Sequence, residues 1–282
     1  MQFDCYGKYI FYDGAMGTML YNYGLKSGEK PDLMNITAPE AVENIHRMYV
    51  EAGSDIVCTN TFGANALSLE GTGYTPAQVV TAAVASAKRA CGDKAKVALD
   101  IGPTGHVLEP AGDLEYEKAY QMFKEIAIAG EKAGADFAAV ETMSDLEELT
   151  AAMTAVTENT NLPILATMSF EKSGYTFMGC TPEKFVETAE ALGASAVGLN
   201  CSLEPIEMLP TAKRIAAATK LPLIVKPNAG LPDASSGQYL TGAQEFAAQM
   251  KEFANIGVKI IGGCCGTSPE YIKELKKVYM EL

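Results

Sequence analysis

Residues 132–141 read KAGADFAAVE, which is the end of a helical pattern, a glycine, and a short apolar run that stops at an acid. The same phrase returns as EAGSDIVCTN over 51–60, as LGASAVGLN over 192–200 and as IGVKIIG over 256–262. A glycine that follows a periodic helical segment is a typical helix C-cap. The apolar runs lack strict alternation, as expected of parallel strands buried on both faces. Each copy therefore predicts a helix followed by a buried strand.

Further strands are predicted between these copies, and helices separate all of them. The additional strands cover 9–13, 96–101, 163–170 and 222–227, and the helices cover 39–52, 75–91, 115–133, 145–159, 182–192, 205–219, 241–255 and 268–280. About eight strand–helix units in alternation predict a (β/α)8 TIM barrel, with residues 1–282 forming a single domain. A doubly wound open sheet is the alternative, but the sequence shows no dinucleotide fingerprint and no second domain.

The composition excludes several classes of protein. The chain has 282 residues, of which 48% are hydrophobic, and 22 basic against 35 acidic residues give a formal net charge of −13. This charge argues against nonspecific binding to nucleic acid or to an anionic membrane. No apolar run is long enough to span a bilayer, and the N-terminus shows no signal peptide. Seven irregularly spaced cysteines favour a reducing cytoplasmic location with free or metal-bound thiols.

Polar residues gather at the predicted carboxyl ends of the strands, where a barrel of this type forms its active site. These residues are Asp13, Asn60, Asp100, Glu141, Ser169, Asn200, Cys201, Lys226, Asn228, Cys264 and Cys265. The long segments 14–38, 102–114 and 228–240 follow three of the strands and are candidate lids or partner surfaces.

Three cysteines follow two of these strands. Cys264 and Cys265 come after two glycines, and Cys201 follows the apolar run 197–200. Adjacent side chains in a strand point to opposite faces, so two neighbouring thiols can reach one ligand where the strand has ended and the backbone turns. Three thiolates that met at the barrel rim could hold one zinc ion and leave a fourth position open for a thiol substrate. The alternative for the adjacent pair is that they are small residues at a tight turn.

Two acids at strand ends suggest a binding site for an amino acid. Asp13 and Glu141 could hold a substrate ammonium group, or they could be a capping acid and an ion pair with Lys226. Gly14 and Ala15 begin a glycine-rich turn whose backbone N–H groups could bind a carboxylate. Together these groups would recognise an α-amino acid that carries a thiol.

The other cysteines and the histidines have simpler interpretations. Cys58 lies inside a predicted strand and is expected in the core, and Cys5, Cys91 and Cys180 are taken as ordinary thiols. His46 is expected to pack in its helix or to lie at the surface. His106, in the segment 102–114, could face the site.

Three motifs resemble the homocysteine S-methyltransferase family: DGAMGT over 13–18, GLNC over 198–201 and GGCCGT over 262–267. They occur in the family's order, and the resemblance covers nearly the whole chain. It implies a zinc-dependent (β/α)8 barrel enzyme that methylates homocysteine to methionine.

The resemblance also implies roles for individual residues. Cys201, Cys264 and Cys265 would be the zinc thiolates at the catalytic centre. Asp13 and Glu141 would bind the homocysteine amino group, and Gly14, Ala15 and the neighbouring amides would bind its carboxylate. Asn200, within the GLNC motif, is placed with the substrate-binding residues.

Two further stretches concern the methyl donor. IGPTG over 101–105 and KPNAGLP over 226–232 are similar to the N-terminal homocysteine-binding module of cobalamin-dependent methionine synthase. The similarity implies methylcobalamin as the donor, carried by another corrinoid module or protein. Since one barrel accounts for the whole chain, the chain would be an excised fragment or a stand-alone subunit.

Four other functions remain open at this stage. The donor could be a betaine or a sulfonium compound, or the chain could be a corrinoid-system subunit that methylates a different thiol. The chain could be a homocysteine-binding module without a competent donor. It could also be a barrel lyase or isomerase that uses Lys226 as a Schiff-base amine and the glycines at 262–263 as a phosphate cradle.

Overall fold

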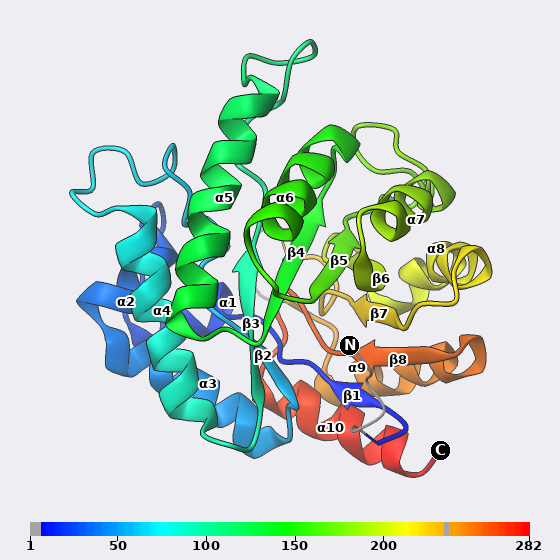
Figure 1. The fold of residues 1–282 in the computed structure, drawn as a ribbon. Helices are drawn as coiled ribbons and strands as arrows, with labels where there is room; N and C mark the ends of the chain where they lie inside the picture. Colours follow the sequence, from blue (N-terminus) through cyan, green and yellow to red (C-terminus); the bar gives the residue numbers. More distant parts are fainter. Residues whose placement is uncertain (1–6, 234–236, 238) are drawn as a thin grey trace.

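The computed structural model describes residues 7–233, 237 and 239–282, and these form a (β/α)8 barrel, which confirms the predicted fold (Figure 1). The strands are all parallel and follow one another in the sheet in the order β1-β8-β7-β6-β5-β4-β3-β2. Their bounds are β1 Ile10–Phe11, β2 Ile56–Cys58, β3 Lys96–Ile101, β4 Phe137–Met143, β5 Ile164–Met168, β6 Ala194–Asn200, β7 Leu223–Lys226 and β8 Val258–Ile261.

The major helices lie within one or two residues of their predicted bounds, with one exception. They are α3 Pro39–Ala52, α4 Pro76–Cys91, α5 Tyr116–Ala133, α6 Leu146–Asn159, α7 Pro182–Ala191, α8 Pro205–Ala218, α9 Ala243–Met250 and α10 Pro269–Met280. Two short helices, α1 Gly17–Leu20 and α2 Met34–Thr37, lie in the first long segment with the 3-10 turns Tyr21–Tyr23 and Pro31–Leu33. The exception is the helix predicted over 241–255, because α9 ends early and a 3-10 turn, Lys251–Ile256, follows it.

The barrel closes between β1 and β2 through a side chain as well as through the backbone. Tyr12 and Ile56 form a single parallel bridge. The Asp55 backbone N–H donates to the Phe11 carbonyl at 2.7 Å, and the Asp55 carboxylate accepts from the Phe11 N–H at 2.8 Å. These bonds satisfy the backbone of a very short strand, so β1 needs few ladder hydrogen bonds.

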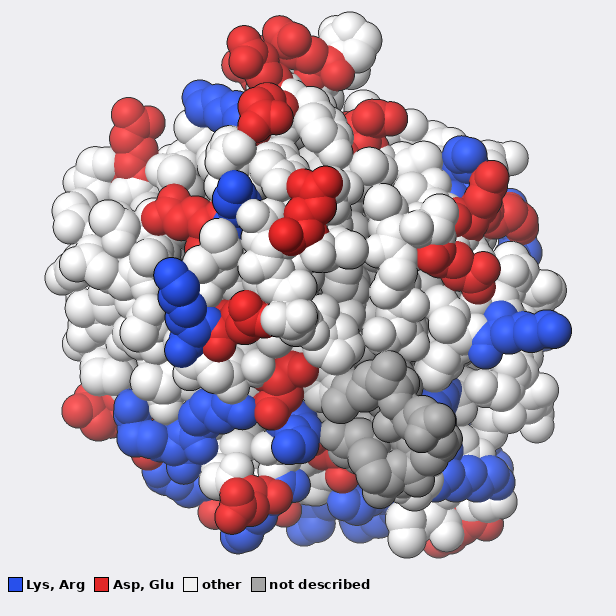
Figure 2. Space-filling view, in the orientation of Figure 1, with Lys and Arg blue, Asp and Glu red and all other residues white. Residues whose placement is uncertain are grey.

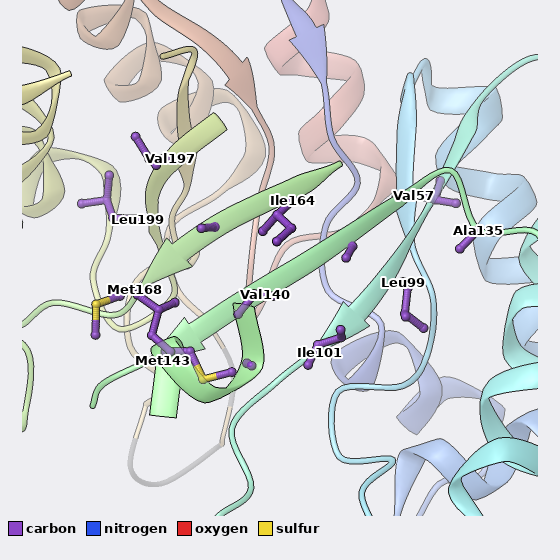
Figure 3. Packing of buried hydrophobic residues seen from close by; sticks show 14 of the residues in the cluster. Val57, Leu99, Ile101, Ala135, Val140, Met143, Ile164, Met168, Val197 and Leu199 are labelled. Atoms are coloured by element: carbon purple, nitrogen blue, oxygen red, sulfur yellow. The ribbon is translucent and has the colours of Figure 1, made fainter. Parts of the chain in front are cut away.

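Two apolar clusters follow from the period of two along each strand. One cluster takes alternate residues from all eight strands and fills the inside of the barrel: Ile10, Tyr12, Ile56, Cys58, Ala98, Phe137, Ala139, Leu165, Ala196, Ile224 and Ile260. The intervening residues, such as Leu99, Val140 and Met168, join the larger cluster between strands and helices (Figure 3). Burial on both faces explains why the strands read as continuous apolar runs.

A buried polar layer covers the inner apolar cluster. Inward-facing side chains alternate along each strand, and in β1 to β7 this series reaches a polar side chain near the carboxyl end of the strand, whereas in β8 it reaches Gly262. In this way the strands contribute Tyr12, Cys58, Asp100, Glu141, Thr167, Asn200 and Lys226, which are all buried. This layer is the floor on which the candidate site is built.

Acidic residues in the first turns of the helices lie at the same end of the barrel. Each major helix begins on the side where the strands end, and α3 and α5 to α10 each have an acid in the first turn: Glu40, Glu117, Glu147, Glu183, Glu207, Glu245 and Glu270. Acids at helix N-termini are stabilised by the helix dipole. Figure 2 shows Lys and Arg gathered along the lower edge of one face, in the region of α3 and α10 in Figure 1.

The structure also bears on membrane association. Among the residues it describes, none of the helices combines the length and the apolar character that a bilayer crossing requires.

Candidate active site

A cavity of about 450 Å³ opens at the carboxyl ends of the strands. Most of the residues singled out from the sequence line it: Asp13, Gly14, Ala15, Glu141, Cys201, Cys264 and Cys265. Residues of the first long segment, including Glu29 and Asp32, also contribute to its wall. The structure therefore brings the thiols, the two acids and the glycine-rich turn to one enclosed space.

The three thiols are spaced as one metal ion would need them. The sulfurs of Cys201, Cys264 and Cys265 all lie within 4.8 Å of one another, and those of Cys201 and Cys265 are 3.8 Å apart. Zn–S bonds of ~2.3 Å in tetrahedral geometry place two sulfurs ~3.8 Å apart. Thiolates are also the ligands that select zinc over harder cations. The donor atoms and their spacing fit a zinc ion.

The backbone at the end of β7 fixes the relative positions of these cysteines. The Cys201 N–H donates to the Lys226 carbonyl at 3.0 Å, and the Cys264 N–H donates to the Pro227 carbonyl at 2.8 Å. Cys201 and Ser202 both have left-handed backbone, with φ of 63° and 59°. Residues other than glycine rarely adopt this conformation, and it is concentrated at functional sites. Here it turns the chain sharply after β6.

Hydrogen bonds among the sulfurs favour one ionised thiol. Hydrogen bonds from Cys201 and Cys264 lower the pKa of Cys265, and the Tyr239 hydroxyl adds another. The hydrogen bond with Cys201 raises the pKa of Cys264. Three interacting thiols titrate as a unit, and the first proton is lost more easily than from an isolated cysteine. Tyr239 was not singled out from the sequence, since its place beside the thiols depends on how the segment 228–240 folds.

Thr267 joins the thiol turn to the turn that follows β1. Its hydroxyl donates to the Cys264 carbonyl at 2.7 Å and accepts from the Ala15 N–H at 3.2 Å. A Cβ at Gly14 or at Gly263 would overlap the Thr267 side chain, so both positions need glycine for the two turns to pack closely against Thr267. The Ala15 amide is thus engaged within the protein, and a bound carboxylate would rely on the neighbouring amides of this turn.

The two acids of the predicted ammonium site have different environments. The Asp13 carboxylate accepts from the Cys58 N–H at 2.8 Å, and burial raises the pKa of Asp13 to about 7. The Glu141 carboxylate is 2.5 Å from the Lys226 ammonium, with both side chains largely buried. The ion pair weighed in the sequence analysis is therefore present, on a glutamate that also lines the cavity.

Cys58 is buried as expected, and it also lines the cavity. Its sulfur lies 3.7 Å from Glu141 Oε2 and 3.9 Å from Lys226 Nζ, and the Tyr12 hydroxyl is 3.6 Å away. Its place on the cavity was not predicted from the sequence. Counting two residues on from the inward-facing Ile56 is the signal that would have found it.

Asn200 holds the polar layer together. It is fully buried and is not among the cavity-lining residues in the part of the chain that the structure describes. Its side-chain oxygen accepts from the Thr142 N–H at 2.9 Å and from the Thr167 hydroxyl at 2.7 Å, and its amide donates to the Thr142 hydroxyl at 2.7 Å. Thr142 has a left-handed φ of 61° and follows Glu141 directly. Asn200 thus links β6, which leads to Cys201, to β4, which carries Glu141.

Of the remaining sequence candidates, Asn60 and Asp100 also line the cavity, whereas the two histidines lie away from it. His46 is fully buried in α3, where burial lowers its pKa to about 4, and it has no side-chain hydrogen bond among the described residues. His106 is exposed, with its Nδ1 3.8 Å from an Asp113 oxygen. Cys5 and part of the segment 228–240, residues 234–236 and 238, lie outside the described residues.

Comparisons with known proteins agree with the motifs. The family model described as homocysteine S-methyltransferase matches residues 10–279. Methionine synthases from Mycobacterium leprae (strain TN) and Mycobacterium tuberculosis (strain ATCC 25618 / H37Rv) are 33% and 34% identical over 291 residues. Each alignment covers 93% of this chain and 24% of the relative, so the chain spans about a quarter of their length.

A solved structure shows the same fold. The metallated form of the homocysteine methyltransferase MmuM from Escherichia coli has a TM-score of 0.81 at 21% identity, with 96% of each chain covered. The family match spans nearly the whole barrel and includes all three motifs. This chain belongs to the homocysteine S-methyltransferase family.

Proposed function

We propose that this chain is a zinc-dependent S-methyltransferase that activates the homocysteine thiol and yields methionine. The proposal is carried by one observation: three thiols from two strand ends lie on the same cavity that Asp13 and Glu141 line. An amino acid with a thiol two carbons beyond its α-carbon has the three groups that such a cavity can bind.

The metal site would be made by Cys201, Cys264 and Cys265. Bound zinc would hold the substrate sulfur as a thiolate, and the three cysteine thiolates would keep that sulfur electron-rich. The chain's own contribution is to hold the three sulfurs close together, through the hydrogen bonds to the β7 backbone and to Thr267, on the wall of the cavity where a substrate thiol would bind. The cysteines that the structure describes are free thiols, which suits a reducing compartment such as the cytoplasm.

The charge of the cavity supports an amino acid substrate over an anionic coenzyme thiol. Asp13, Asp100 and Glu141 line it, and against them stands the ammonium of Lys226, the one lysine that is buried among the described residues. A substrate ammonium would compensate this excess of acid, whereas a second anionic group in the same place would be repelled. The amides of residues 14–18 would then hold the substrate carboxylate.

The methyl donor is proposed to be methylcobalamin on another corrinoid module or protein. The relatives that carry this barrel within a longer chain are methionine synthases, and the KPNAGLP stretch was already similar to the module from such enzymes. A betaine or a sulfonium compound is the alternative donor. The acidic first turns around the cavity end would favour a cationic donor of this kind.

The test combines metal analysis with methyl transfer from methylcobalamin, a betaine and a methylsulfonium donor. Wild-type protein should bind one zinc ion and form methionine from homocysteine. Cys264→Ala should lose both properties, while Cys180→Ser, at a half-buried cysteine away from the cavity, should keep both. Full zinc occupancy in Cys264→Ala would overturn the ligand assignment. Zinc-loaded wild type that methylates homocysteine with none of the donors would overturn the activity.

A further inference from the structure

A buried lysine occupies the floor of the cavity beside the acids. Lys226 is 4% exposed, and its ammonium lies 2.5 Å from Glu141 Oε2, 3.9 Å from the Cys58 sulfur and 4.1 Å from the centre of the Tyr12 ring. Glu141 provides the ion pair recorded for this lysine within the described part of the chain. A buried ammonium is costly without such a partner, so the pair must be kept or replaced.

A second carboxylate nearby has an oxygen without a hydrogen-bond partner among the described residues. Asp100 is the penultimate residue of β3, is 7% exposed and lines the cavity, and its Oδ1 accepts no hydrogen bond from the described residues. Single oxygens of Asp100 and Glu141 and the sulfur of Cys58 lie within 4.8 Å of one another. Burial raises the pKa of Asp100 well above its usual range, Glu141 adds to the rise, and Lys226 opposes it. Asp100 is thus a buried acid that a cation would stabilise.

These three groups do not form a second metal site. Their spacing would suit a metal ion, but the Lys226 ammonium already contacts both Glu141 and Cys58. A metal ion beside that ammonium would be repelled. The cation that this cluster accommodates is the lysine itself.

Substrate binding creates a competition for Glu141. If the proposed function holds, the α-ammonium of homocysteine binds at Asp13 and Glu141, and Glu141 is also the partner of Lys226. Two ammonium groups on one buried carboxylate repel each other at short range. We propose that Asp100 is a positioning residue that takes over the Lys226 ammonium when the substrate ammonium binds Glu141.

The exchange needs no movement of the backbone. The lysine side chain has four flexible methylene groups, and a carboxylate oxygen of Asp100 lies within 4.8 Å of one of Glu141, the present partner of Lys226. In the bound state two ammonium groups would share three carboxylates. The pair of Asp100 and Lys226 would therefore matter for ligands that carry an ammonium group and not for ligands that lack one.

The experiment measures the affinity of zinc-loaded protein for L-homocysteine and for mercaptobutyrate, its deamino analogue, by calorimetry. The analogue has the same thiol and carboxylate and lacks the amine. Asp100→Asn should weaken homocysteine binding at least about tenfold, because Lys226 then has no charged partner in the bound state. The affinity for mercaptobutyrate should change less than about twofold. In a Lys226→Met background, Asp100→Asn should have little effect on either ligand, because no displaced ammonium remains.

Three results would overturn the inference. One is an equal loss of affinity for both ligands in Asp100→Asn, which indicates a merely structural role. Another is an additive effect of the two substitutions on homocysteine binding. The third comes from Lys226→Met alone, which carries the test should Asp100→Asn not fold: this variant should bind homocysteine at least as tightly as wild type, and a tenfold loss contradicts the exchange. Wild-type protein that binds mercaptobutyrate and not homocysteine would reject the proposed substrate, and the exchange with it.

Discussion

Replacing Asn200 by alanine tests how the polar layer holds the site. The side chain is fully buried and joins β4, β5 and β6 through Thr142 and Thr167. Alanine would leave the Thr142 N–H and the Thr167 hydroxyl without their acceptor. It would also release the left-handed backbone of Thr142 beside Glu141.

The expected loss of stability follows from these groups. A buried donor without a partner costs about 1–3 kcal/mol, so two of them lower the free energy of unfolding by about 2–6 kcal/mol. The Thr142 hydroxyl is half-buried and adds less, because water can replace the lost bond. Asn255→Ala is the matched control, because Asn255 is exposed and its one recorded side-chain bond is a 3.4 Å contact with Glu252. It should change the free energy by less than about 0.5 kcal/mol.

Urea unfolding of the zinc-free proteins, followed by circular dichroism, measures both variants without interference from metal binding. The homocysteine KM of zinc-loaded Asn200→Ala should rise as well, because Glu141 and Cys201 flank the lost hydrogen bonds. Should Asn200→Ala unfold at the same urea concentration as Asn255→Ala, the structural role given to Asn200 is wrong. A large rise in KM with unchanged stability would instead support direct contact with substrate.

Three further predictions concern the turns and thiols of the site. Because burial raises the pKa of Asp13 to about 7, this acid is protonated below that pH. Calorimetry should therefore show the affinity for homocysteine falling by up to about tenfold per pH unit between pH 7 and 5. Mercaptobutyrate is the control, and the same pH dependence of affinity for both ligands would contradict the role of Asp13 in binding the ammonium group. After chelation of zinc in air, mass spectrometry should show a mass loss of two hydrogens and a disulfide-linked peptide containing Cys201, because its sulfur is 3.8 Å from that of Cys265. Three thiols that stay free would count against this disulfide. Gly14→Ala should lower the free energy of unfolding, measured in urea, by about 1–3 kcal/mol, because the new methyl group overlaps the Thr267 side chain. An unchanged midpoint of the urea unfolding curve would show that this contact is not tight.

The order of elements could be predicted from the sequence because the signals are local. Glycine at a helix end and a short apolar run recur in each unit, so a helix such as α6 was placed within one residue of its bounds. The end of α9 was missed because the residues of the 3-10 turn Lys251–Ile256 have ordinary helical composition, and periodicity does not separate the two helix types over six residues. β1 was predicted over 9–13 and covers Ile10–Phe11, because its pairing with β2 is reduced to one bridge.

The site was harder to predict because its contacts cross the barrel. The residue types at the strand ends were visible in the sequence, and the three motifs pointed to the family. The ion pair of Glu141 with Lys226 joins β4 to β7, and local patterns leave such a pairing as one of two alternatives. The place of Cys58 on the cavity floor needs the inward register of β2, which a strand of three residues does not reveal by itself.

Three cysteine sulfurs are proposed to hold zinc, and the substrate sulfur to take the remaining position. X-ray absorption at the zinc edge tests this arrangement directly, before and after addition of homocysteine. We expect three sulfur neighbours at about 2.3 Å with one lighter atom, and four sulfur neighbours once homocysteine is bound. Fewer than three sulfurs in the resting protein, or a spectrum that homocysteine leaves unchanged, would contradict it.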